Sequence, residues 1–122
     1  MRYVVAALSV VLLAACSGGG DEPAAQVRPW GKPAEVRGSA VTVQFTGSAC
    51  QKSRDYRAEE TSEQVVLTVR ETTGGGSCVA MAVTYTVVAE LEAPLGDRAL
   101  VDGACLLEKY ADDPDVCGAD AS

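Results

Sequence analysis

The sequence contains no histidine at any of its 122 positions, and this absence limits the chemistry that the chain can perform. Histidine is the usual general base near neutral pH and a frequent metal ligand. Without it, Ser-His-Asp and Cys-His catalysis are excluded, as are zinc sites built on imidazole. No two cysteines have the Cys-x-x-Cys spacing that is typical of a metal site. We therefore predict no catalytic residue, no metal ligand and no cofactor.

Positive charge is also scarce. Ten Lys and Arg residues face 17 Asp and Glu residues, which gives a formal net charge of −7, and beyond residue 37 the numbers are 6 and 14. No segment forms the basic stripe that binds phosphate backbones, so nucleic acid is not an expected partner. An acidic surface does not adhere to anionic lipid. The charge is therefore expected to keep the domain soluble and away from the membrane surface.

The start of the chain has the features of an export signal. Arg2 is the only charge before residue 21, and residues 4–13 are apolar except for Ser9. This pattern is typical of a secretory signal peptide. The apolar run is shorter than the roughly 20 residues that a membrane-spanning helix needs.

The apolar run ends in Leu13-Ala14-Ala15-Cys16, which resembles a bacterial lipobox. The resemblance implies that the Cys16 thiol is acylated with diacylglycerol and that residues 1–15 are then removed. Lipidated Cys16 would hold the mature chain on the outer face of the cell membrane, and stable anchoring takes two or more acyl chains. The alternatives are an ordinary cleaved signal with a coincidental cysteine and a buried apolar helix.

Residues 16–37 have the composition of a tether. A flexible Ser/Gly run at 17–20 is followed by Pro23, Pro29 and Pro33 with almost no apolar periodicity. Such segments behave as coils or stiff spacers. Trp30 could dock onto the domain or lie at the lipid interface, but a lone tryptophan in a linker is expected to do neither decisively. The folded domain is therefore predicted to span residues 38–122.

A domain of this size has marginal stability from its core alone, so covalent cross-links are expected in an exported chain. Cys50, Cys78, Cys105 and Cys117 remain after Cys16 is assigned to the lipid, and they allow three pairings. We favour Cys50–Cys78 and Cys105–Cys117, because the second pair encloses a compact C-terminal loop rich in turn residues.

Alternation of apolar and polar residues predicts an all-β domain. The longest alternating segment has its odd-numbered residues, from Val79 to Leu91, on one face. Short turns between consecutive strands favour antiparallel pairing in a small β-meander sheet or sandwich, and Leu106 to Ala111 could form a helical turn. The predicted strands cover residues 41–45, 56–58, 65–69, 79–91 and 99–101.

The order of several residues resembles a group of small secreted or lipid-anchored actinobacterial proteins. The resemblance spans roughly residues 40 to 103, and its most specific part is a PLGDR segment followed by VD. It implies an uncharacterised extracytoplasmic domain with no known activity, ligand or catalytic residue. It also supports the Cys50–Cys78 pairing, because both cysteines lie in the shared stretch. The matching residues are Cys50, Tyr56, Glu60-Thr61, Val65, Cys78, Leu91, Pro94-Leu95-Gly96-Asp97-Arg98 and Val101-Asp102.

Two acidic groups are candidates for chemistry, and each has a simpler interpretation. Asp112, Asp113 and Asp115 have nearly the alternate spacing of calcium ligands, but the run lacks the Gly and the distal Glu of an EF-hand loop. We therefore interpret it as a surface turn. Residues 59–63 contain three glutamates that could act as paired carboxylates, as in glycosidases. A solvated hairpin loop is the preferred interpretation of this segment.

Tyr56 and Arg98 are the candidate binding residues. Arg98 could be an exposed anchor, since arginine is enriched at interface hot spots. We favour a structural role for Arg98, either within the PLGDR turn or paired with an acidic neighbour such as Asp102.

The sequence leaves more than one class of function open. We favour a non-catalytic binding or accessory module at the membrane, which recognises an envelope protein or another envelope component. The alternatives are a small hydrolase that works through carboxylates alone, and a carrier of a small ligand. A hydrolase would need two acids with separated pKa values in one pocket, and the strand alternation does not bring two acids together.

Overall fold

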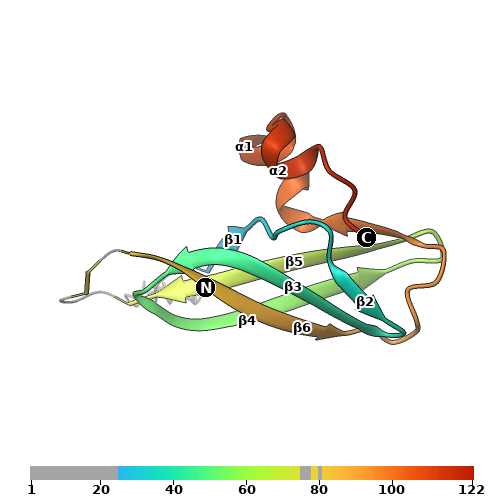
Figure 1. Cartoon of the computed structure of the whole chain (residues 1–122), viewed down its shortest axis with the longest axis horizontal. Coiled ribbons are helices and arrows are strands. Elements are labelled where there is room, and N and C mark those ends of the chain that lie inside the picture. Colours follow the sequence, from blue (N-terminus) through green and yellow to red (C-terminus); the bar gives the residue numbers. More distant parts are fainter. Residues whose placement is uncertain (1–24, 75–77, 80) are drawn as a thin grey trace, which may run out of the picture.

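The computed structural model describes residues 25–74, 78–79 and 81–122 and has an all-β fold (Figure 1). The predicted signal peptide and Cys16 lie outside the described residues. Within the described part of the chain, no helix is long and apolar enough to cross a membrane. Its elements are β1 (Gln26–Arg28), β2 (Glu35–Arg37), β3 (Ala40–Ser48), β4 (Gln51–Glu60), β5 (Gln64–Thr73), β6 (Ala82–Glu90), β7 (Ala99–Asp102), the 3-10 helix η1 (Gly103–Leu106), α1 (Glu108–Ala111) and α2 (Pro114–Cys117).

The strands form two sheets that pack against each other. In the first sheet β5 is central, with β4 on one side and both β1 and β7 on the other. The second sheet has the order β2-β3-β6 and is antiparallel throughout. The prediction of a small sandwich is confirmed, and the meander alternative is wrong, because β3 pairs with β6 and not with β4, which follows it in the chain.

One strand pair departs from the antiparallel expectation. Gln64–Leu67 of β5 pairs in parallel with Ala99–Asp102 of β7. The chain has to cross between the sheets here, because β6 belongs to the second sheet. It returns through residues 91–98 and enters the first sheet in the same direction as β5.

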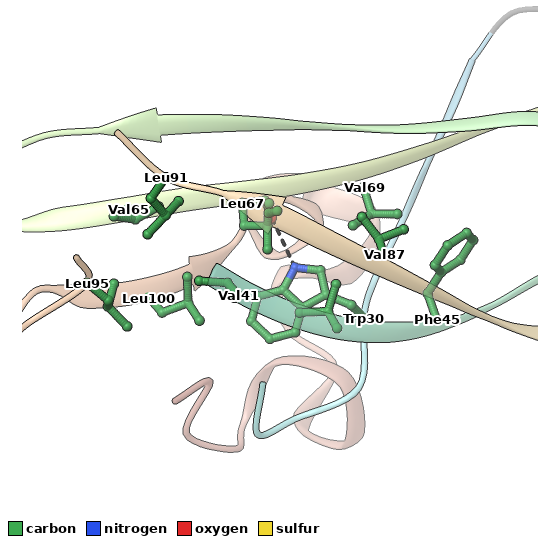
Figure 2. Close-up of a cluster of buried hydrophobic side chains, with 12 residues drawn as sticks. Trp30, Val41, Phe45, Val65, Leu67, Val69, Val87, Leu91, Leu95 and Leu100 are labelled. Carbon is green, nitrogen blue, oxygen red and sulfur yellow. Dashed lines mark hydrogen bonds between the residues drawn. The ribbon is translucent and has the colours of Figure 1, made fainter. Parts of the chain in front are cut away.

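The core lies between the two sheets (Figure 2). It is built from the alternating apolar residues that the sequence predicted in β3, β5 and the second half of β6. The Trp30 side chain fills the same space, and its Nε1–H donates to the Leu67 carbonyl at 3.0 Å. The buried cluster consists of Trp30, Val41, Val43, Phe45, Val65, Leu67, Val69, Val87, Ala89, Leu91, Leu95 and Leu100.

The predicted boundary between tether and domain is wrong. β1 pairs with β5 and β2 pairs with β3, and Trp30 between them is only 2% exposed. The domain therefore begins near residue 25 instead of residue 38. Strands of three residues are too short to show periodicity in the sequence. Pro29 and Pro33 lie in the connection between β1 and β2, outside both strands.

The long alternating segment before Leu91 is only partly a strand. β6 begins at Ala82, and Val87, Ala89 and Leu91 point into the core as predicted. The alternation also predicts Val79 and Met81 on this buried face, but they are 75% and 60% exposed. They precede β6, which begins at Ala82, so the alternation of the strand does not orient them toward the core.

Both predicted disulfides are confirmed. Cys50–Cys78 joins the β3–β4 connection to the segment before β6, and Cys105–Cys117 joins η1 to α2. The predicted helical turn corresponds to η1 and α1. The sequence pattern missed α2, where the Asp113 carboxylate accepts a hydrogen bond from the Asp115 backbone N–H and caps the helix.

Candidate functional site

A groove beside Trp30 is the candidate site. It lies between the β1–β2 connection, the outer face of the second sheet and α2, and it encloses a volume of about 430 Å³. The Gly31 backbone N–H donates to the Gln44 carbonyl at 2.7 Å and holds the connection against β3. The groove is lined by Pro29, Trp30, Gly31, Lys32, Gln44, Phe45, Thr46, Thr84, Asp115, Val116 and Ala119.

The floor of the groove belongs to a row of uncharged side chains on β3 and β6, which we name the threonine face. Its residues alternate along β3 and β6 and point outward, so that Thr46 lies directly opposite Thr84. Hydroxyl and amide side chains both donate and accept hydrogen bonds, so this face suits an uncharged polar ligand. The threonine face consists of Thr42, Gln44, Thr46, Thr84, Thr86 and Val88.

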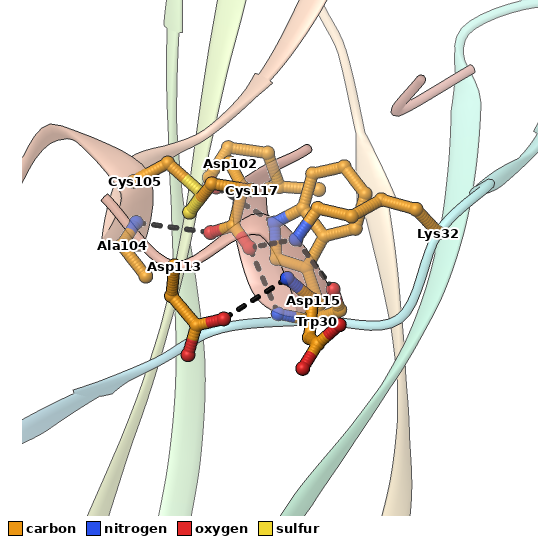
Figure 3. The surroundings of a disulfide bond; sticks show 9 residues. Trp30, Lys32, Asp102, Ala104, Cys105, Asp113, Asp115 and Cys117 are labelled. Atoms are coloured by element: carbon orange, nitrogen blue, oxygen red, sulfur yellow. Dashed lines mark hydrogen bonds and ion pairs between the residues drawn. A yellow bond between two sulfur atoms is a disulfide. The ribbon is translucent and has the colours of Figure 1, made fainter. Parts of the chain in front are cut away.

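One wall of the groove is fixed by a buried ion pair (Figure 3). Lys32 Nζ donates to Asp102 Oδ2 at 2.5 Å and to the Trp30 carbonyl at 2.7 Å, and it lies 4.6 Å from the centre of the Trp30 ring. Asp102 also accepts from the backbone N–H groups of Trp30 and Ala104, each at 2.9 Å. Lys32 therefore stabilises the fold, and Asp102 neutralises its charge beside the groove.

The acidic run at 112–115 contributes one carboxylate to the rim of the groove. Asp115 lines it, whereas the Asp113 side chain caps α2. The described residues contain no group of three or more His, Cys, Asp and Glu side chains placed to hold a metal ion. The structure therefore adds no support for a calcium site in this run.

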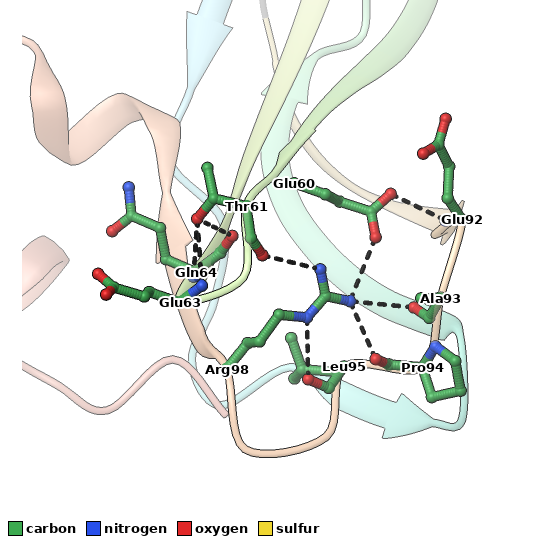
Figure 4. Close-up of polar contacts among 9 residues, drawn as sticks. All are labelled: Glu60, Thr61, Glu63, Gln64, Glu92, Ala93, Pro94, Leu95 and Arg98. Carbon is green, nitrogen blue, oxygen red and sulfur yellow. Dashed lines mark hydrogen bonds and ion pairs between the residues drawn. The ribbon is translucent and has the colours of Figure 1, made fainter.

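Arg98 is held within the molecule (Figure 4). Its side chain is 15% exposed and pairs with the Glu60 carboxylate at 3.2 Å. The same guanidinium donates to four backbone carbonyls, at 2.9 to 3.3 Å. These contacts agree with the structural role that the sequence predicts for Arg98. The carboxylate partner, however, is Glu60 and not Asp102. The four carbonyls belong to Thr61, Ala93, Pro94 and Leu95.

The three glutamates near the β4–β5 hairpin have different surroundings and partners. A hydrogen bond from the Glu92 backbone N–H is the largest effect on Glu60 and lowers its pKa. Burial raises the pKa, but contacts with Arg98 and the Ala93 backbone lower it, so that the pKa stays below its ordinary value. Glu59 pairs with Arg57 at 3.2 Å, and Glu63 is exposed in the turn. A general acid needs a raised pKa, so Glu60 has the opposite property.

Tyr56 connects the free edges of the two sheets. Its hydroxyl accepts a hydrogen bond from the Glu90 backbone N–H at 3.1 Å, and the side chain is 36% exposed. On the same face of β4, the Arg54 guanidinium lies 5.0 Å from the centre of the Tyr85 ring. The exposed part of Tyr56 remains available for contact, but it lies away from the groove.

The chain matches no family model, no curated protein and no solved structure. Within the PLGDR-x-x-VD segment, the structure gives several residues a role in the fold. Leu95 is buried, Gly96 has a φ of +57° that favours glycine, and Asp102 holds Trp30 and Lys32.

The sequence interpretation missed the groove because its wall was assigned to a tether. A signal for its floor was nevertheless present. The outward positions of the two predicted strands carry Thr42, Gln44, Thr84 and Thr86, which are uncharged although the chain is strongly acidic. This combination can point to a surface that is kept free of charge for contact.

Proposed function

We propose that this protein is a lipoprotein, anchored through Cys16 to the outer face of the cell membrane, and that its sandwich is a non-catalytic binding module. The groove beside Trp30 carries the proposal of binding. Its volume of about 430 Å³ lies within the range of small-molecule and peptide-side-chain sites, and its floor offers uncharged hydrogen-bonding groups.

The lipid anchor is supported by the sequence and by the cysteine arrangement. The apolar run and the Leu-Ala-Ala-Cys segment have the order of a lipoprotein signal. The other four cysteines form two disulfides, which are typical of chains folded outside the cytoplasm. This pairing leaves Cys16 as the cysteine that is free to receive lipid.

The non-catalytic role is supported by the side chains that are present. Histidine does not occur in the sequence. Glu60 and Glu71 have lowered pKa values, and hydrogen bonds hold each of them as a structural carboxylate. Lys32, the cation that lines the groove, is neutralised by Asp102. These groups stabilise the fold and do not converge on a shared reaction centre.

The proposed partner is an envelope protein with an uncharged polar contact surface. The threonine face can donate and accept hydrogen bonds along two neighbouring strands, which matches the groups that a polypeptide backbone offers. The apolar side chains of Pro29 and Val116 at the groove would add contact area. Both features favour a polypeptide over a highly charged polymer.

Cross-linking in the cells that make the protein tests this proposal. The tagged, acylated chain is compared with a Thr84→Arg variant, in which a long cation occupies the groove floor. Ser62→Arg is the matched control, because it places the same charge on the exposed hairpin turn. We expect one dominant cross-linked envelope protein, lost in Thr84→Arg and retained in Ser62→Arg.

Two results would contradict the proposed partner. One is the same cross-link in both variants, which would place the contact away from the groove. The other is the absence of a cross-linked protein at every linker length. The second result would favour the carrier of a small ligand, which the groove volume also suits.

A further inference from the structure

One end of the sandwich combines exposed apolar side chains with an exposed cation. Val79 and Met81 are 75% and 60% exposed there. The Met81 carbonyl accepts from the Ala49 backbone N–H at 2.8 Å, and the Cys50–Cys78 disulfide fixes the start of this segment. Lys52 lies two residues after Cys50 and is exposed. We name the surface formed by Lys52, Val79 and Met81 the apolar tip.

The N-terminal part of the chain leaves the domain toward the apolar tip. β1 is antiparallel to β5, and Gln26 lies opposite Glu71, two residues before β5 ends at Thr73. Gln51, next to Cys50, pairs with Thr73. Residue 25 therefore emerges at the end of the sandwich that carries the disulfide, Val79 and Met81.

The correction of the domain boundary makes the connection to the lipid short. Only nine residue steps separate Cys16 from Ala25. A fully extended chain spans at most about 3.6 Å per residue, so this connection reaches roughly 30 Å. An anchor at Cys16 would therefore hold the apolar tip near the bilayer. Weak contacts between the tip and the lipid would then be favoured by the high effective concentration of the lipid surface.

The distribution of charge favours the same orientation. At the apolar tip, Lys52 forms no ion pair with any described residue. The opposite end of the sandwich, where the β4–β5 hairpin and the β6–β7 connection meet, carries exposed carboxylates. Cations are attracted to anionic headgroups and carboxylates are repelled. The exposed carboxylates at the far end are Glu63, Glu90, Glu92 and Asp97.

We propose that the apolar tip rests on the surface of the bilayer that holds the acyl anchor, with Val79 and Met81 at the level of the lipid headgroups. This inference rests on the proposed anchoring through Cys16. It revises the expectation that the acidic domain stays away from the membrane, because the net charge is not evenly distributed. The acidic end then points outward.

Quenching by brominated lipid tests the orientation. Purified acylated protein is placed in phosphatidylcholine–phosphatidylglycerol vesicles, with or without brominated acyl chains, after vesicle flotation has shown that it binds. The tested variant is Val79→Trp, and the matched control is Val88→Trp, at a position that is 52% exposed on the outer face of β6. The native Trp30 is buried and serves as the background.

We expect brominated lipid to reduce the fluorescence of the Val79→Trp variant and to leave the Val88→Trp variant close to the parent. Protein that floats with vesicles but shows equal or no quenching in the two variants overturns this inference and leaves the anchor intact. Quenching in Leu106→Trp, a 67% exposed position beside α1, without quenching in Val79→Trp also overturns it. Protein that does not float overturns the anchor and this inference together.

Discussion

Two buried carboxylates attach the N-terminal segment to the sandwich. Glu71 accepts from Arg28 Nε at 2.7 Å, from Gln51 Nε2 at 2.9 Å and from the Ser48 backbone N–H at 3.2 Å. Asp102 does the equivalent for Trp30 and Lys32. Burial of a carboxylate is costly unless it is paired and hydrogen-bonded, and both conditions are met here.

Replacement of Glu71 tests this connection. Burial raises the pKa of Glu71, but hydrogen bonds from Gln51, Ser48 and Arg28 together with the Arg28 charge outweigh burial and hold the pKa below its ordinary value. A lowered pKa in the folded state contributes stability above the unfolded pKa and loses it as pH falls through the folded pKa. We expect Glu71→Gln to cost about 2 kcal/mol of unfolding free energy near neutral pH.

The pH dependence distinguishes this role from simple packing. The stability of the parent should fall steeply below about pH 4.3, the ordinary pKa of a glutamate, and that of Glu71→Gln should fall less. Thermal unfolding followed by circular dichroism over this range measures both effects. Glu63→Gln, at an exposed turn position, is the control and should resemble the parent. Parallel curves for Glu71→Gln and the parent would show that this carboxylate is not a significant source of the pH dependence.

At the scale of elements, the sequence predicted the strands that have alternating apolar residues and missed those that lack them. β3, β5 and the end of β6 show the period of two, because each buries one face in the core. β1 and β2 have three residues each and are held by pairing with β5 and β3. The position of β1 depends on pairing with residues about 40 places away in β5, and that of β2 on pairing with the strand that follows it. Local sequence patterns do not encode such contacts.

Trp30 shows the same limit for the candidate site. Its neighbours in sequence, Pro29 and Gly31, are typical of a linker, and the partners that bury it come from β5 and β7. A tryptophan in a tether and a tryptophan that completes a core therefore have the same local sequence. The disulfide pairing was easier to predict from the sequence. Only four cysteines remain once Cys16 is assigned to the lipid, and the loop between Cys105 and Cys117 is rich in turn residues.

Replacement of Trp30 tests whether the domain begins near residue 25. We expect Trp30→Ala to destabilise the domain by about 3–5 kcal/mol, because it removes a buried aromatic side chain and leaves a cavity. Urea unfolding followed by circular dichroism measures the change. Ser62→Ala, at an exposed position in the β4–β5 turn, is the comparison and should leave the unfolding midpoint unchanged. An unchanged midpoint in Trp30→Ala would show that residues 25–37 belong to the tether and not to the domain.

At the scale of the whole molecule, we propose a polarised domain that its lipid anchor holds close to a membrane. The chain enters at the end with the apolar tip, the carboxylates gather at the other end, and the threonine face lies along the side of the second sheet. This arrangement would leave the groove open to a neighbouring envelope protein. The orientation at the membrane depends on an anchor at Cys16, which is therefore the central claim.

The mass of the mature N-terminal peptide tests the anchor most directly. Membrane-fraction protein is digested, and the peptide that contains Cys16 is measured by mass spectrometry, with a Cys16→Ser precursor as the control. We predict a chain that begins at Cys16 and carries the added mass of diacylglycerol, and a Cys16→Ser precursor that is neither processed at this site nor anchored. An unmodified Cys16, or a Cys16→Ser protein that stays anchored and normally processed, would contradict the account.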